Sequence, residues 1–106
     1  MSEWFLFLPQ VRMEISDIVV RAQVAESCGF DGIAFIDHLE APGATHQKIW
    51  EAMTVATWVA AQTERLRIGH LVLCDAFRHP AVLAKQALTL SAASDGRFEL
   101  GLGSGS

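Results

Sequence analysis

The stretch that decides the fold runs from Pro80 to Gly103 and reads PAVLAKQALTLSAASDGRFELGLG. Proline at its start suits the first position of a helix, because that position needs no backbone N–H donor. Apolar residues then recur at helical spacing, and we expect the buried stripe to consist of Leu83, Ala84, Ala87 and Leu88. The turn signal SDG leads into the short apolar run RFELGL. This segment therefore predicts a helix, a turn and a strand.

Three similar apolar runs precede this segment: WFLFLP from Trp4, GIAFI from Gly32 and RIGHLVL from Arg67. Each has the length of a strand, and none alternates cleanly between apolar and polar residues. That pattern is typical of strands that are buried on both faces of a parallel sheet. The runs begin about 30 residues apart, which is the size of one βα unit.

The segments between these runs read as helices. Ser16 is expected to cap the first helix, and Gly29 is expected to end it. The second helix is expected to bury one face, made of Ile49, Ala52, Met53, Ala56, Val59 and Ala60. Val55 and Trp58 form a second apolar patch on this helix, which indicates either a subunit contact or packing against another helix.

The predicted order is β-α-β-α-β-α-β, with parallel strands and right-handed crossovers. Four strands leave apolar surface uncovered, whereas a closed (β/α)8 barrel needs eight strands and roughly 250 residues. We therefore expect an α/β fold that forms the N-terminal half of a TIM barrel. Residues 1–106 would be one partial barrel domain, truncated at its C-terminus.

Composition excludes several classes of protein. Hydrophobic residues make up 51% and charged residues 19%, with a net charge of −4, and no basic stripe indicates nucleic-acid binding. No uninterrupted apolar stretch of about 18 residues predicts a membrane span, and the N-terminus lacks the basic region of a signal peptide. Cys28 and Cys74 form no CxxC motif and are expected to be reduced thiols of a cytoplasmic protein. The apolar composition suggests surface meant either for a partner or for further parts of a larger fold.

The four strand ends carry the candidate functional groups, because parallel strands place their carboxyl ends on one rim. These groups are Pro9-Gln10, Asp37-His38, Cys74-Asp75 and Gly103-Ser104-Gly105. His38 is expected either to carry a proton near neutral pH or to be a plain loop histidine. Asp37 is expected to orient His38 or to cap the next segment. Cys74 suits a pocket wall better than a nucleophile, because no neighbouring base is evident.

Two further residues follow the third strand. Arg78 either approaches an anion or is simply solvated, and His79 stands where a helix N-cap would. The histidines and cysteines show no metal-ligand spacing, so no metal site is expected. The final GLGSGS ends the chain instead of opening a helix, and so is not a dinucleotide-binding fingerprint. It is either half of a binding loop or a flexible linker.

The segments FLFLPQ, AESCGFDGIAFIDHL and TERLRIGHLVLCDAFRHPAVLAKQALTLSAASDGRFELGLGSG resemble the luciferase-like monooxygenase family of flavin- and deazaflavin-dependent oxidoreductases. The resemblance covers nearly the whole chain in order. It implies a TIM barrel whose cofactor, coenzyme F420 or alternatively FMN, lies over the strand ends. Hydride would pass between this cofactor and a small organic substrate.

By the same resemblance, His38 and Asp37 would be the catalytic residues, with His38 moving the proton. The cofactor-binding residues would be Leu71, Val72, Cys74, Gly103, Ser104 and Gly105. The resemblance also implies a non-proline cis peptide between Leu71 and Val72. The chain alone is expected to be inactive, and a homodimer or a higher self-association is expected. Two alternatives stay open: a non-catalytic half-barrel scaffold that assembles with itself, and a generic α/β ligand-binding module.

Overall fold

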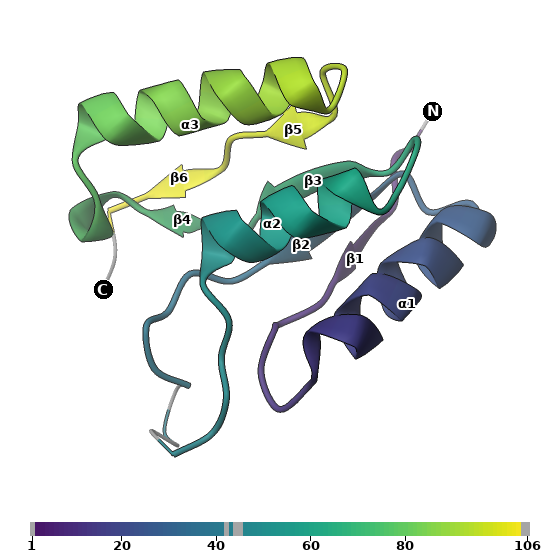
Figure 1. The fold of residues 1–106 in the computed structure, drawn as a ribbon, viewed down its shortest axis with the longest axis horizontal. Coiled ribbons are helices and arrows are strands. Elements are labelled where there is room, and N and C mark those ends of the chain that lie inside the picture. The colour runs from purple at the N-terminus through teal and green to yellow at the C-terminus, as the bar shows by residue number, and fades with distance from the viewer. Residues whose placement is uncertain (1, 42, 44–45, 105–106) are drawn as a thin grey trace.

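The computed structural model describes residues 2–41, 43 and 46–104. Strands and helices alternate along the chain, followed near the end by shorter elements (Figure 1). The elements are β1 (Phe5–Phe7), α1 (Ile15–Ser27), β2 (Gly32–Phe35), α2 (Ala52–Ala61), β3 (Arg67–His70), β4 (Leu73–Cys74), the 3₁₀ turn η1 (Asp75–Phe77), α3 (Pro80–Ala93), β5 (Phe98–Glu99) and β6 (Leu102–Gly103).

The main sheet has the order β1-β2-β3-β5, and every pairing in it is parallel. A second, two-stranded parallel pair joins β4 to β6. The predicted α/β class with parallel strands is therefore confirmed. The predicted third and fourth strands are each divided in two, because the chain bends at Leu71-Val72 and at Leu100-Gly101 and continues in the second pair. The peptide bond between Leu71 and Val72 is cis, as the resemblance implied.

The core lies between one face of the sheet and the three helices. Ile33, Phe35 and Ile68 project from β2 and β3 and are fully buried. They belong to one cluster with Ile18 of α1 and Val59 of α2. Figure 1 shows α1 beside β1 and β2, α2 in front of β3, and α3 beside β5. This layering leaves the carboxyl ends of the strands open at one edge.

The helix ends follow the sequence in two of three cases. Gly29, with φ of 90°, follows α1 in the left-handed region that glycine tolerates. Pro80 occupies the start of α3, and His79 caps it, since its Nδ1 accepts the N–H of Ala81 at 3.1 Å. The prediction of Ser16 as a cap was wrong. Helix α1 begins at Ile15, because the carbonyl of Glu14 already accepts the N–H groups of Asp17 and Ile18.

The buried faces of α2 and α3 differ in part from those predicted. In α3, Leu83 and Leu90 are buried, whereas Leu88 is 66% exposed and Ala84 is also exposed. The helix lies against the edge strand β5, so only a narrow stripe is covered.

Helix α2 begins at Ala52, so Ile49 precedes it and instead pairs with Val11. Val55 belongs to the buried core, but Trp58 is 51% exposed. The predicted patch of Val55 and Trp58 therefore does not exist as one surface. None of the helices in the described part of the chain is long and apolar enough to cross a membrane.

Candidate functional site

A hollow of about 710 Å³ lies at the carboxyl ends of β2, β4 and β6. The three strands end at this edge because β2 and β3 run parallel and β4 carries the chain of β3 onward to pair with β6. Its lining consists of Asp37, His38, Leu71, Val72, Cys74, Ala76, Phe77, Gly103 and Ser104. The structure thus brings together the residues predicted to be catalytic or cofactor-binding, except Gly105, which lies outside the described residues; Pro9-Gln10 and Asp75, the other candidates at the strand ends, do not line the hollow.

The hollow has an apolar wall. Leu71 is 62% exposed, and Val72 and Phe77 of the same lining are also exposed. Two glycines let β6 approach this wall. A Cβ at Gly101 would lie 2.5 Å from the carbonyl oxygen of His70, and one at Gly103 would collide with the Val72 side chain. The backbone of β6 therefore packs closely against the wall, and no side chain projects from it at Gly101 or Gly103.

His38 and Asp37 are neighbours in sequence but have different surroundings. His38 is exposed at the mouth of the hollow. The Asp37 side chain is almost fully buried, and its described partners are Cys74 and Arg78 rather than His38. Asp37 was expected either to orient His38 or to cap the next segment, and its described hydrogen bonds do not go to His38. Burial by itself would raise the pKa of Asp37, but hydrogen bonds from Arg78 and from the Cys74 N–H lower this pKa below its usual value.

Arg78 is the residue that sequence reasoning left undecided. Its side chain is only 12% exposed, so the solvated alternative was wrong. The anion that it approaches is internal: its guanidinium donates to the Asp37 carboxylate and, at 3.2 Å, to Glu51 Oε2. The hydrogen bond that Arg78 donates to Asp37 raises the pKa of Arg78 further, so the guanidinium stays charged. The only sequence signal for this role was its place directly after the third strand.

Cys74 lines the hollow and is buried. Its backbone N–H donates to Asp37 Oδ2 at 2.7 Å, and its carbonyl accepts from Arg78 Nη1 at 3.2 Å. The side chain thus forms a small part of the wall, as its position predicted. Its backbone N–H and carbonyl are both hydrogen-bonded to charged side chains.

The end of the first strand does not contribute to the lining. Gln10 is fully buried below the rim. Its amide nitrogen donates to the carbonyls of Ile36 and Trp50, at 2.5 and 3.1 Å, and its Oε1 accepts the Ile36 N–H at 3.0 Å. Gln10 therefore fixes the chain that leads from β2 into Asp37, a supporting role that the sequence did not reveal.

His70 is a second polar group that the sequence did not single out. It lies at the end of β3, is 3% exposed, and donates through Nε2 to the Ala52 carbonyl at 2.8 Å. Among the described residues, its Nδ1 has no hydrogen-bond partner. Burial lowers the pKa of His70 and keeps the ring neutral. The described residues contain no group of three or more histidine, cysteine or carboxylate side chains placed to hold a metal ion.

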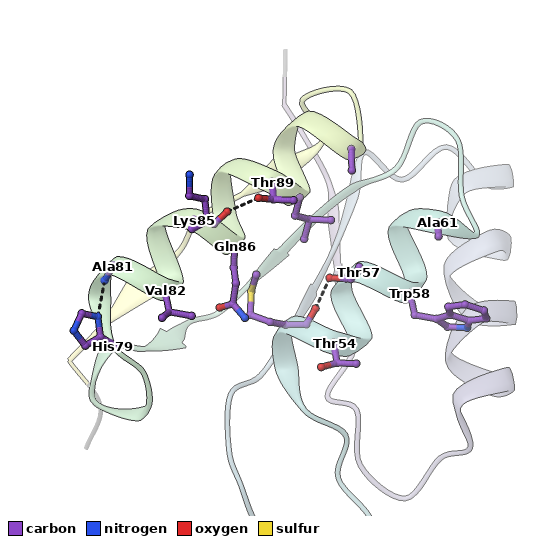
Figure 2. A pocket seen from close by; sticks show the side chains of 13 residues that line it. Thr54, Thr57, Trp58, Ala61, His79, Ala81, Val82, Lys85, Gln86 and Thr89 are labelled. Atoms are coloured by element: carbon purple, nitrogen blue, oxygen red, sulfur yellow. Dashed lines mark hydrogen bonds between the residues drawn. The ribbon is translucent and has the colours of Figure 1, made fainter.

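A larger hollow of about 920 Å³ lies between α2 and α3, away from the strand ends (Figure 2). Thr54, Thr57 and Trp58 of α2 line it, together with Val82 and Gln86 of α3. None of the predicted site residues belongs to it. The strand-end hollow, which combines a histidine with an apolar wall and polar backbone, is the better candidate for chemistry.

Comparisons with known proteins agree with this geometry. Residues 3–106 match the family described as luciferase-like monooxygenase. The F420-dependent glucose-6-phosphate dehydrogenase of Beutenbergia cavernae is 37% identical over 90 residues, covering 84% of this chain and 27% of that protein. The same enzyme of Intrasporangium calvum is 36% identical over 96 residues, covering 87% of this chain and 27% of that protein.

The fold is also shared with solved structures. An F420-dependent secondary alcohol dehydrogenase in complex with an F420-acetone adduct superposes with a TM-score of 0.89 at 23% identity, covering 98% of this chain and 32% of that one. The chain thus spans 27% of the length of the two curated relatives. Taken together, the matched residues, the parallel sheet and the superposition show that this chain belongs to the luciferase-like monooxygenase family.

Proposed function

We propose that this chain forms part of the active site of an F420-dependent oxidoreductase that moves hydride between the deazaflavin and a small organic substrate. One observation carries the proposal: residues from the ends of β2, β4 and β6 line a single hollow with His38 at its mouth. Both curated relatives described above are named as F420-dependent, which favours F420 over FMN as the cofactor.

The lining of the hollow fits a flat ring. Leu71 and Val72 offer exposed apolar surface, and Gly103 adds no side chain that would stand above it. A planar, largely apolar ring gains free energy by covering such a surface. Ser104 places a polar group at the margin, where the ring's polar edge would lie. Bound F420 would supply the carbon that accepts or donates the hydride.

His38 is proposed as the proton carrier. When a substrate alcohol is oxidised, its carbon loses hydride to the cofactor and its hydroxyl loses a proton, which the neutral imidazole can accept. In the reverse direction the imidazolium returns that proton to the carbonyl oxygen. Histidine suits this exchange near neutral pH, and its exposed position leaves the ring free to meet a substrate.

A fluorescence titration of the purified protein with F420, run beside one with FMN, tests the cofactor. Turnover of the complete enzyme that contains this chain is then followed with glucose 6-phosphate and with 2-propanol as probe substrates. We expect His38→Ala to lower kcat by about a hundredfold, the lower range for losing a general acid–base, with little change in F420 affinity. His46→Ala is the matched control, because His46 is exposed and does not line the hollow.

Two results would contradict this proposal. Failure of both cofactors to bind to the complete enzyme would remove the cofactor assignment, whereas failure to bind to this chain alone would show only that its rim groups are insufficient by themselves. Saturable F420 binding with unchanged turnover in His38→Ala would leave the cofactor in place but refute the role of His38.

Self-association is the second candidate, in line with the alternative of a half-barrel that assembles with itself. Trp58, Val82 and Leu88 expose apolar surface on α2 and α3, and the first two line the hollow of Figure 2. Burying such surface against a second copy would be favourable. Sedimentation equilibrium tests this candidate: a mass that rises from monomer to dimer with concentration supports it, and a constant monomer mass excludes it.

A further inference from the structure

We propose that Arg78 is a positioning residue, which together with Asp37 clamps the backbone of Cys74 and so holds the wall of the hollow in place. This inference rests on the proposed function for its consequence in cofactor binding, but the clamp itself stands on geometry alone. It also gives Asp37 a task other than proton transfer.

The clamp consists of Asp37 and Arg78, which form hydrogen bonds to both backbone polar groups of Cys74. Asp37 Oδ2 accepts the Cys74 N–H at 2.7 Å, and Arg78 Nη1 donates to the Cys74 carbonyl at 3.2 Å. Asp37 and Arg78 are in turn joined to each other through both guanidinium nitrogens, with Nη2 to Oδ1 at 3.2 Å. Three residues from two distant segments therefore form one closed hydrogen-bonded ring.

The ion pair that closes this ring is shielded from water. The Asp37 side chain is 1% exposed and that of Arg78 is 12% exposed. A charge in such a place is strongly destabilising when its partner is removed, because it is left buried and uncompensated. The planar guanidinium serves the carboxylate and the carbonyl at once, whereas a lysine ammonium is a single point charge on a flexible chain.

The clamp connects the candidate site to the rest of the fold. Cys74 pairs with Gly103 in the β4–β6 pair, so its position also sets that of β6. Arg78 reaches Glu51, whose carboxylate accepts the N–H groups of Met53 and Thr54 at the start of α2. One guanidinium thus joins the end of β2, the wall of the hollow and the start of α2.

Thiol labelling of Cys74 tests the clamp without any need for activity. In a Cys28→Ala background, Cys74 is the sole cysteine, and because it is buried its labelling rate reports local opening. We expect Arg78→Gln to raise this rate about tenfold or more, since hydrogen bonds to charged groups are strong and about 1.4 kcal/mol corresponds to a factor of ten. Asp37→Asn should act in the same direction, and Arg78→Lys should fall between Arg78→Gln and the unsubstituted protein.

Arg65→Gln is the matched control, because Arg65 is exposed and its described ion pair is with its neighbour Glu64. Hydrogen exchange of the β2 amides, measured on the same samples, separates local opening from global loss of stability. An unchanged labelling rate in Arg78→Gln overturns the inference. The inference is also overturned if the exchange rates of the β2 amides rise by the same factor as the labelling rate of Cys74, because global unfolding would then explain both increases.

F420 titration of the same variants tests the consequence for the site. If Arg78→Gln opens Cys74 and weakens F420 binding about tenfold, while Arg78→Lys partly restores both, the positioning role is supported. If Cys74 opens but the variants bind F420 as tightly as the unsubstituted protein does, the clamp is structural only and the positioning role is refuted. If Cys74 opens while even the unsubstituted complete enzyme fails to bind F420, the clamp stands and the proposed function fails.

Discussion

Replacing Arg97 with methionine should lower the stability of this fold by a large share of its total. Arg97 lies in the turn before β5, at the end of the sheet away from the candidate site. Its guanidinium donates to the Ser94 carbonyl at 2.8 Å and to the Ala60 carbonyl at 2.8 Å. It also donates to Thr63 Oγ1 and to the Leu66 carbonyl, both at 3.0 Å. One side chain therefore ties the last turn of α2 to the end of α3.

The size of the effect follows from these contacts. Four hydrogen bonds, each worth a net of about 0.5–1.5 kcal/mol, predict a loss of about 2–4 kcal/mol in the free energy of unfolding. The lower half of the range for each bond is more appropriate, because Arg97 is itself half-buried and water can partly replace its guanidinium when it is removed. A domain of this size is stable by only about 5–15 kcal/mol, so the loss is a large share of the total.

Urea unfolding followed by tryptophan fluorescence and by circular dichroism measures this loss. With a slope of about 2 kcal/mol per molar, the midpoint should fall by about 1–2 M for Arg97→Met. Arg97→Lys keeps the charge but serves fewer acceptors, so about half of that shift is expected. Arg21→Met, on the exposed surface of α1, is the control and should stay within about 0.5 kcal/mol. A shift for Arg97→Met no larger than that of the control would refute the reasoning.

Two further predictions concern His70 and Gly101. Burial lowers the pKa of His70 in the folded chain below its usual value of about 6.5. As the pH falls, the unfolded chain therefore takes up the proton first. The contribution of the neutral ring to the free energy of unfolding is complete above about pH 6.5 and is lost as the pH falls through the lowered pKa. The urea midpoint should drop between pH 7.5 and 5.5, and an equal drop in His70→Gln would show that another group is responsible. Gly101→Ala should destabilise by about 1–3 kcal/mol and weaken F420 binding, because its Cβ would press on the His70 carbonyl; a midpoint and an affinity equal to those of the unsubstituted protein would contradict this.

Much of the fold was predictable because its signals are local. Pro80 at a helix start, Gly29 after a helix and the SDG turn each act within a few residues, and each is found where the sequence places it. The division of the third and fourth strands was harder to see. RIGHLVL reads as one apolar run, and only the pairing of β4 with β6 shows that its second half leaves the main sheet.

Burial was predicted less well than helical position. The expected stripe on α3 included Leu88, which faces outward because this helix covers a single edge strand. Periodicity says which residues share a face of a helix, but the width of the buried stripe depends on how many neighbours the helix has. The buried glutamine at position 10 was missed for a related reason. Its partners Ile36 and Trp50 come from other segments of the chain.

By itself, the sequence determined the order of strands and helices and the rim on which Asp37, His38, Cys74 and Gly103 end, because hydrophobic periodicity and parallel topology are properties of the chain order. Only the tertiary structure decided which of these groups remain free. Asp37 and Arg78 are 41 positions apart and become partners through the packing of the β2 end against η1. The buried Asp37 carboxylate is stable only beside a counter-charge, and Arg78 provides it. The carboxylate therefore faces Arg78 rather than His38, and His38 is left exposed at the mouth of the hollow.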